Sequence, residues 1–216
     1  MKWSENAWSS VELIYGKTIE LPFIKEIIDG TLDKKKFVFY IQQDSLYLAD
    51  YAKIMTGLAT RVTDLEHVDA FLGFTKDCLY VENELHQTLF AQYGVTDKPR
   101  RTPTCLLYTS YLLSQFLSPV EVMAASFLPC FWVYKAVGDY IHANQTADNN
   151  PYQAWIDTYG GEEFTASVNK AINICDTLAA AATEQRRNEM TEAFVTACRM
   201  EWMFWDSAYN LEQWKV

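Results

Sequence analysis

Apolar side chains recur at steps of three and four residues along most of this chain, and residues that break helices are scarce. Between Val11 and Phe23, for example, the apolar residues at positions 11, 14, 15, 19 and 23 follow this spacing. The 216 residues include 8 Gly and 6 Pro, and no segment alternates apolar and polar residues between Asn-Gly or Asp-Gly turns. Because this spacing places apolar side chains on one face of an α-helix, the sequence predicts an all-α protein.

Capping residues, prolines and glycines divide the periodic pattern into about eight helices. Thr63-Asp64-Leu65-Glu66 has a capping-box pattern, and Ser118-Pro119-Val120-Glu121 combines a cap, a first-turn proline and a glutamate. The clearest loop, residues 97–103, is too short to link two domains. We therefore predict one domain over residues 1–216, a single-domain helical bundle. Its predicted helices span residues 4–28 with a bend at Pro22, 37–58, 63–93, 104–116, 118–143, a short segment from Pro151 to Gly160, 162–182 and 184–209.

The charge balance argues against a nucleic-acid partner. The chain has 28 acidic and 18 basic residues, a formal net charge of -10, whereas phosphate backbones are bound by Lys and Arg. The basic clusters at residues 34–36, 98–101 and 186–187 are short and typical of solvated surface. Half of the residues are hydrophobic, which predicts a sizeable folded core rather than a disordered chain.

Neither a membrane span nor a disulfide framework is predicted. The apolar-rich stretch from Val120 to Val133 contains Glu121 and Pro129 and is shorter than the roughly 20 residues that a membrane span needs. Residues 1–10 lack an apolar signal core. The five cysteines form an odd number without a Cys-x-x-Cys pair, which favours reduced thiols. We expect a cytoplasmic protein with no membrane partner.

A tyrosine-rich face surrounds one carboxylate in the second predicted helix. Tyr40, Asp44, Tyr47 and Tyr51 follow one another at steps of four, three and four residues, so they share one side of a helix. A carboxylate among phenols suits a planar ring that offers hydrogen-bond donors along one edge. The alternative is a contact between helices in which the tyrosines satisfy the aspartate.

A cysteine follows a proline inside the helix predicted for residues 118–143. Pro129 removes a backbone hydrogen bond and can kink the helix, and Cys130 and Tyr134 share the next face. A thiol at a kink can face a cavity, where a lowered pKa or a nearby base would make it a nucleophile. The alternative is a buried cysteine that packs as a small apolar side chain.

A third constellation, Glu201 with Phe204 and Trp205, lies in the last predicted helix. A glutamate packed among aromatic rings has a raised pKa, which suits a general acid near neutral pH. The alternative is a glutamate paired with Arg199 or with a tyrosine. Elsewhere, Glu82 and His86 stand four residues apart and could bind a metal. The duplicated Glu-x-x-His motif of di-iron bundles does not occur in the sequence, so an intrahelical Glu82–His86 pair is the simpler interpretation. We predict no metal and no cofactor.

Together these segments resemble the TenA/thiaminase II family over essentially the whole chain. Five motifs carry the resemblance, in this order along the chain: Gln43-Asp44-x-x-Tyr47-Leu48, Tyr108-Thr109-x-Tyr111-Leu112-Leu113, Leu128-Pro129-Cys130-x-Trp132-x-Tyr134, Tyr152-x-x-Trp155-Ile156-x-x-Tyr159 and Glu201-x-x-Phe204-Trp205-Asp206. Some branches of the family lack the Pro-Cys motif and place a glutamate pair in the pocket. This chain keeps Cys130 and resembles the cysteine-containing branch.

The resemblance implies an all-α, haem-oxygenase-like fold, assembled as a homotetramer. It also implies an enzyme of thiamin salvage that hydrolyses aminopyrimidines related to thiamin, converting 4-amino-5-aminomethyl-2-methylpyrimidine to the hydroxymethylpyrimidine and ammonia. Water replaces the group on the exocyclic methylene, which is an amine or, in thiamin itself, the thiazolium. The hydroxymethylpyrimidine product re-enters thiamin synthesis.

The motifs also assign roles to residues of this chain. By resemblance, Cys130 is the nucleophile that adds to the pyrimidine ring, and Glu201 is the acid/base that protonates the ring and the leaving group and later activates water. Asp44 binds the amino-nitrogen edge of the ring. The residues that would line and stack the pocket are Tyr47, Tyr108, Tyr134, Tyr159 and Phe204, with Tyr111 as an alternative to Tyr108.

Two other functions stay open at this point. One is a metal oxygenase on the same scaffold that uses Glu82, His86 and other acids. The other is a binding or regulatory protein that holds a pyrimidine without turnover. The family has also been described as transcription activators, and the net charge of -10 argues against direct DNA binding here. The preferred substrate among the aminomethylpyrimidine, its formyl precursor and thiamin also stays open.

Overall fold

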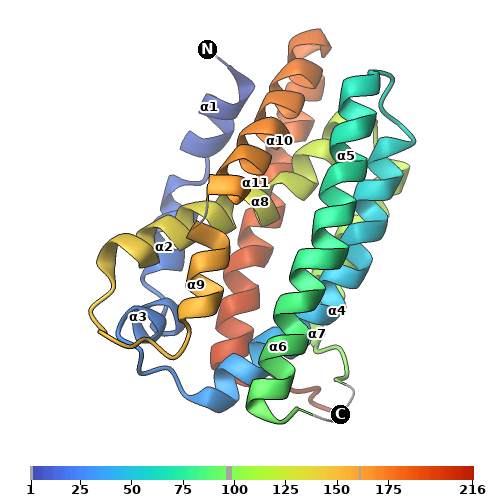
Figure 1. Cartoon of the computed structure of the whole chain (residues 1–216). Helices are drawn as coiled ribbons and strands as arrows, with labels where there is room; N and C mark the ends of the chain where they lie inside the picture. The colour runs from blue at the N-terminus through green and yellow to red at the C-terminus, as the bar shows by residue number, and fades with distance from the viewer. Residues whose placement is uncertain (1, 96–98, 161) are drawn as a thin grey trace.

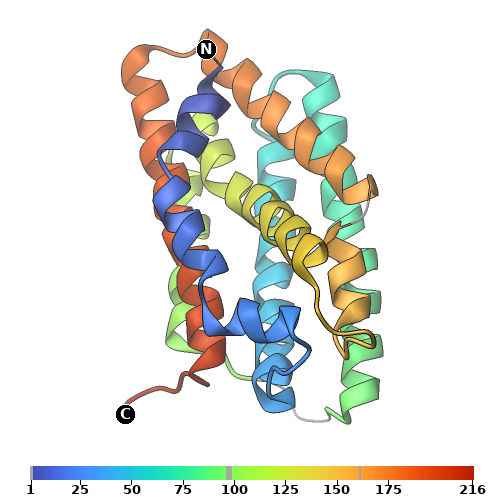
Figure 2. The same cartoon turned by 90° about the vertical axis from the view of Figure 1, so that its left-hand side faces the viewer.

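A computed structural model describes residues 2–95, 99–160 and 162–216, and it shows a bundle of helices (Figures 1 and 2). Within these residues there is no β-strand, which confirms the predicted all-α class. The helices are α1 (Trp3–Ser9), α2 (Glu12–Ile19), α3 (Pro22–Ile28), α4 (Lys34–Ala59), α5 (Leu65–Asp77), the π-helix η1 (Cys78–Glu82), α6 (Asn83–Tyr93), α7 (Pro103–Ser114), the 3-10 helix η2 (Gln115–Leu117), α8 (Val120–Asn144), α9 (Gln153–Gly160), α10 (Glu162–Ala181) and α11 (Glu184–Tyr209).

The apolar helix α8 forms the centre of the bundle. It packs against α11, α10 and α9, and Figures 1 and 2 show it crossing the longer helices at an incline. By length and composition α8 could cross a membrane, but 67% of its apolar window is buried inside the protein. Phe127, Leu128 and Val137 have no exposed surface. Residues 122–129 are all buried, so the hydropathy of this part of α8 reflects burial in the core.

The first predicted helix is divided into three. The bend expected at Pro22 is the start of α3, but a further break separates α1 from α2 at Ser10 and Val11. The Ser10 hydroxyl donates to the Asn6 carbonyl oxygen at 2.8 Å. Because such side-chain bonds offer the backbone an alternative to continued helix, Ser10 favours an end at this point. This break and the two short single-turn elements raise the number of described helices above the predicted eight.

The structure corrects two predicted caps. Asp64, rather than Thr63, caps α5, since its carboxylate accepts from the Glu66 amide at 2.8 Å. Ser118 does not cap α8: its hydroxyl donates to Gln115 Oε1 at 2.9 Å, and Pro119 occupies the capping position. Residues 97 and 98 of the predicted loop, and Gly161 of the predicted Gly160-Gly161 stop, lie outside the described residues.

The helix predicted over residues 63–93 is one column with a π-helical turn inside it. In Figure 1, α5 passes into α6 without a change of direction, and η1 joins them. A π-helical turn accommodates one more residue than an α-helical turn. Both parts of the column face the core: Phe71 and Phe74 are buried before the turn, and His86 and Leu89 after it.

Candidate active site

A cavity of about 410 Å³ lies between α4, α5, α8, α9 and α10. Four of the eight predicted site residues line it: Asp44, Cys130, Tyr134 and Tyr159. The other four, Tyr47, Tyr108, Glu201 and Phe204, are buried beside it rather than in its wall. Ring contacts connect the two groups, because Tyr47 stacks on the lining residue Tyr51 with ring centroids 5.4 Å apart.

Cys130 is partly exposed and lines the cavity one turn before Tyr134. Burial raises the pKa of the Cys130 thiol well above its usual value, and the negative charge of Glu201 raises it further. The Tyr47 hydroxyl lies near enough to lower that pKa in part. At neutral pH the thiol of the free protein therefore carries its proton.

Glu201 is buried in α11, and its partner is a tyrosine. The Tyr108 hydroxyl donates to Glu201 Oε1 at 2.6 Å. Burial raises the pKa of Glu201 to about 8, although the hydrogen bond from Tyr108 acts in the opposite direction. Of the two partners considered from the sequence, Arg199 or a tyrosine, the structure has the tyrosine. A carboxyl group with such a pKa is protonated in most molecules at pH 7 and can act as a general acid.

Tyr108 and Tyr111, the two candidates on α7, point to different parts of the molecule. Tyr108 is 1% exposed and forms a hydrogen bond with Glu201, and its ring centroid lies 4.8 Å from that of Tyr47. The Tyr111 hydroxyl donates instead to the backbone oxygen of Ala193 at 3.2 Å. Tyr108 is therefore the member of the pair that lies at the site.

Asp44 is 3% exposed, lines the cavity and pairs with a residue from another helix. His86 Nε2 lies 3.0 Å from Asp44 Oδ2. This contact differs from the tyrosine partners weighed for Asp44 from the sequence. The Glu82–His86 pair considered from the sequence involves Glu82, whose side chain is outside the described part of the structure.

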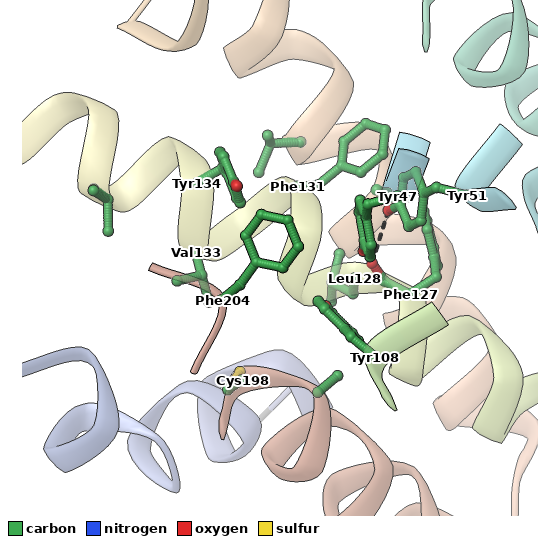
Figure 3. Packing of buried hydrophobic residues seen from close by; sticks show 14 of the residues in the cluster. Tyr47, Tyr51, Tyr108, Phe127, Leu128, Phe131, Val133, Tyr134, Cys198 and Phe204 are labelled. Atoms are coloured by element: carbon green, nitrogen blue, oxygen red, sulfur yellow. Dashed lines mark hydrogen bonds between the residues drawn. The ribbon is translucent and has the colours of Figure 1, made fainter. Parts of the chain in front are cut away.

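Aromatic rings from five helices surround the interior of the site. Figure 3 shows the ring of Phe204 among those of Tyr47, Tyr108 and Tyr134. The ring centroid of Phe204 lies 5.8 Å from that of Tyr47, and the ring centroid of Tyr134 lies 5.2 Å from that of Tyr159. The Tyr134 hydroxyl is 3.0 Å from that of Tyr40. These rings provide apolar faces on which a planar heterocycle can stack.

The position of Tyr159 depends on a glycine in α8. A Cβ atom at Gly138 would lie 3.0 Å from the backbone oxygen of Tyr159. Because that contact is tighter than ordinary packing allows, Gly138 lets α9 approach α8 closely. The close approach brings Tyr159 into the cavity wall with Cys130 and Tyr134.

The sequence interpretation missed several residues of the site. His86 was weighed only as a metal ligand or as the partner of Glu82, and Cys78 was counted only as a reduced thiol, yet Cys78 lines the cavity from η1. Phe131 and Phe164 also line it. Tyr51 carried a signal, because it follows Tyr47 by one turn on the face that holds Asp44. No group of three or more potential metal-ligating side chains occurs among the described residues.

The chain is similar to the TENA/THI-4/PQQC family over residues 8–211. A protein from Bacillus subtilis named aminopyrimidine aminohydrolase is 34% identical, over 99% of this chain and 92% of that protein. A protein of the same name from Helicobacter pylori is 32% identical, over 97% of this chain and 100% of that protein. The multifunctional thiamine biosynthesis protein ThiED from Corynebacterium efficiens is 32% identical over 93% of this chain and 27% of its own length.

Solved structures share the fold. A protein from Silicibacter described as a TenA family transcription regulator superposes with a TM-score of 0.88 at 23% identity, covering 96% of each chain. A TenA homologue from P. horikoshii gives a TM-score of 0.88 at 22% identity, covering 97% of this chain and 99% of the other. At these identities the likeness concerns the arrangement of helices.

Proposed function

The chain belongs to the TENA/THI-4/PQQC family, and from this premise we propose that it hydrolyses thiamin-related aminopyrimidines. The substrate we propose is 4-amino-5-aminomethyl-2-methylpyrimidine, which water converts to the hydroxymethylpyrimidine and ammonia. Relatives named aminopyrimidine aminohydrolase at 34% and 32% identity over nearly the whole chain support this reaction. The observation that carries the proposal is one cavity with Cys130 and Asp44 in its wall and Glu201 close by.

Binding uses the two kinds of group that a neutral heteroaromatic ring requires. The rings of Tyr134 and Tyr159 provide stacking faces, and the Asp44 carboxylate accepts hydrogen bonds from the amino-nitrogen edge. A pocket of about 410 Å³ falls within the range typical of small-molecule sites. Bound in this way, the ring lies within reach of Cys130, which shares the same wall.

Chemistry begins with Glu201 in its protonated form. Its pKa of about 8 keeps a proton available near neutral pH, and it gives that proton to the ring as the Cys130 sulfur adds to a ring carbon. Glu201 regains a proton when the thiol loses its own, so the addition is neutral overall. The raised pKa of Cys130 makes this coupling necessary, because little thiolate exists beforehand.

The adduct then loses its leaving group. Glu201 protonates the amine, which departs from the exocyclic methylene, and water takes its place while Glu201 accepts a proton from that water. Release of the sulfur restores the aromatic ring, and the proton that the ring had gained returns through Glu201 to the sulfur, which restores the free thiol. Each step uses the proton on one carboxyl group, which suits a buried acid with a pKa close to the operating pH.

The test is ammonia release from the aminomethylpyrimidine by wild type, Cys130→Ala and Glu201→Gln. We expect both variants to fold and to lose turnover by at least about two orders of magnitude. Cys175→Ala is a matched control, because Cys175 is buried against the backbone of Ala124 and is not among the residues that line the cavity. Full activity of Cys130→Ala would overturn the role of the thiol. No release by folded wild-type protein, with tight binding of the product, would favour a binding protein.

We infer a cytoplasmic homotetramer that acts in thiamin salvage. The exposed leucines of α5 and η1 support assembly, since Leu65, Leu72 and Leu79 are each at least half exposed. All five cysteines are free in the structure, which agrees with a reducing compartment.

A further inference from the structure

A histidine from another helix holds the carboxylate in the wall of the cavity. His86 Nε2 lies 3.0 Å from Asp44 Oδ2, and the two side chains are about 5% exposed or less. A carboxylate offers only acceptors, so the imidazole is the donor in this pair. The contact joins α6 to α4 across 42 positions of sequence.

The surroundings of His86 restrict its ring. Its imidazole stacks on Phe90, one turn later in α6, with ring centroids 6.0 Å apart and 20° between the planes. The π-helical turn η1 precedes it and carries Cys78, a lining residue of the same cavity. The segment that lines the cavity at Cys78 therefore also presents His86 to Asp44.

We propose that His86 is a positioning residue for the reaction: it binds one oxygen of Asp44 and leaves the other for the amino edge of the pyrimidine. This inference rests on the proposed hydrolase function, and it adds a residue and a basis for substrate selection. His86 binds Oδ2, and Asp44 lines the cavity. The ligand class selected is a planar heterocycle with an N–H donor on the edge that faces Asp44.

Because Asp44 and His86 are both buried, the hydrogen bond between them matters for the direction of the carboxylate. A carboxylate taken out of water needs hydrogen-bond donors, and one that lacks them rotates toward whatever donor it finds. His86 supplies a donor from a packed helix, so the second oxygen of Asp44 keeps one direction before the ligand arrives. A preorganised acceptor discriminates strongly against a ligand that lacks the matching donor, because the buried acceptor then stays unpaired.

The binding experiment uses two probes and four proteins. The probes are the product, 4-amino-5-hydroxymethyl-2-methylpyrimidine, and the same molecule without its 4-amino group. The proteins are wild type, His86→Leu, His86→Gln and the matched control His142→Leu, which removes an exposed imidazole from the end of α8. Dissociation constants are measured by calorimetry, kcat and KM by ammonia release, and folding by thermal denaturation.

We expect His86→Leu to weaken binding of the amino-bearing probe by about 10- to 100-fold. Binding of the probe without the amino group should change little, so the preference between the two probes collapses. KM should rise more than kcat falls. His86→Gln, which keeps a donor, should lie closer to wild type than to His86→Leu, and His142→Leu should match wild type. A merely structural role would weaken both probes alike, and that result would overturn the inference.

A measurement on the unmodified protein covers the case in which His86→Leu does not fold. In a ¹⁵N–¹H correlation spectrum of histidine side chains, we expect the His86 Nε2 proton to be present and protected from exchange. It should shift when the amino-bearing probe binds, and shift less with the other probe. An unprotonated Nε2 would overturn the inference. Failure of wild type to release ammonia or to bind either probe would instead overturn the proposed function.

Discussion

The hydrogen bond between Tyr108 and Glu201 sets the proton affinity of the proposed acid. Burial raises the pKa of Glu201 to about 8, and the Tyr108 hydroxyl lowers it from a still higher value. Tyr108→Phe removes that donor, so the pKa of Glu201 should rise. We expect the decline of kcat/KM at alkaline pH, which follows ionisation of Glu201, to move to higher pH. A pH–rate profile from pH 6 to 10 measures the shift.

Tyr111→Phe is the matched control for that change. Tyr111 lies one turn away on the same helix, and its hydroxyl bonds to the Ala193 backbone. Removal of this hydroxyl should leave the pH at which kcat/KM declines on the alkaline side unchanged. If the alkaline decline of kcat/KM in Tyr108→Phe stays at the same pH or moves to lower pH, Glu201 is not the group whose ionisation limits the rate.

Glu201 also makes folding stability depend on pH. Its pKa is about 8 in the folded protein and 4.5 as its ordinary value, so the folded state holds the proton more tightly. Its effect on the free energy of unfolding is most favourable below pH 4.5, declines as pH rises toward 8, and is constant above that. Glu201→Gln cannot ionise. We expect its stability relative to wild type to increase from pH 5 to 8, measured by urea denaturation; a constant difference would contradict the raised pKa.

At the residue scale, what the sequence could predict followed helical spacing. Counting residues along a single helix placed Asp44 on the tyrosine-rich face of α4, and Cys130 with Tyr134 on one face of α8. All three line the same cavity. The partner of Asp44 could not be found in this way, because His86 comes from a helix 42 positions later. Residue-by-residue roles in the reaction stay predictions.

At the scale of elements, the column α5–η1–α6 shows why helical periodicity located the segment but not its detail. Apolar positions over residues 63–93 predicted one helix, and the structure has one column with a π-helical turn at Cys78–Glu82. Residues on both sides of the turn pack into the core, Phe74 before it and Leu89 after it. Apolar spacing of three and four residues does not reveal where a helix accommodates one extra residue in a π-helical turn.

The π-helical turn supports a prediction about deletions. Each residue of an α-helix turns the chain by about 100°. Because the turn absorbs one extra residue, deletion of Tyr80 should convert η1 to ordinary α-helix and keep His86 facing Asp44. Tyr80 is 67% exposed, so its loss removes little packing. Product binding should stay within about tenfold of wild type.

Deletion of both Leu79 and Tyr80 is the contrasting variant. It removes one residue more than the π-helical turn absorbs, so α6 should rotate by about 100° and take His86 away from Asp44. Binding of the product should then fall well below that of the single deletion, while the helical circular dichroism stays similar. Equal binding by the two variants would mean that the turn does not set the register of α6.

At the scale of the whole molecule, the hydrophobic content predicted a sizeable folded core, and the described residues form a large cluster of buried apolar side chains. Composition did not predict how the helices cross. The centre is α8, which packs against α11, α10 and α9, and the sequence identified it only as an apolar-rich stretch. Contacts between helices far apart in sequence decide that arrangement, which is why the cavity is visible only in the folded chain.

The surface of the molecule carries a row of exposed leucines along α5 and η1. Leu65, Leu72 and Leu79 are spaced seven residues apart and are 81%, 50% and 50% exposed. Seven residues are close to two helical turns, so the three side chains share one face and form a seam to which another helix can pack. Leu13 is 74% exposed on α2 and lies outside this row.

The row leads to a prediction about assembly. If it lies in the contact between subunits, the native mass should be four times that of the 24.9 kDa chain. Leu72→Glu places a charge at the centre of the row and should lower the mass measured by light scattering after gel filtration, because a buried, unpaired charge opposes association. Leu13→Glu makes the same change away from the row and should leave the mass as it is. A tetramer that tolerates Leu72→Glu would place the contact on another face, and a monomeric wild type would contradict the assembly itself.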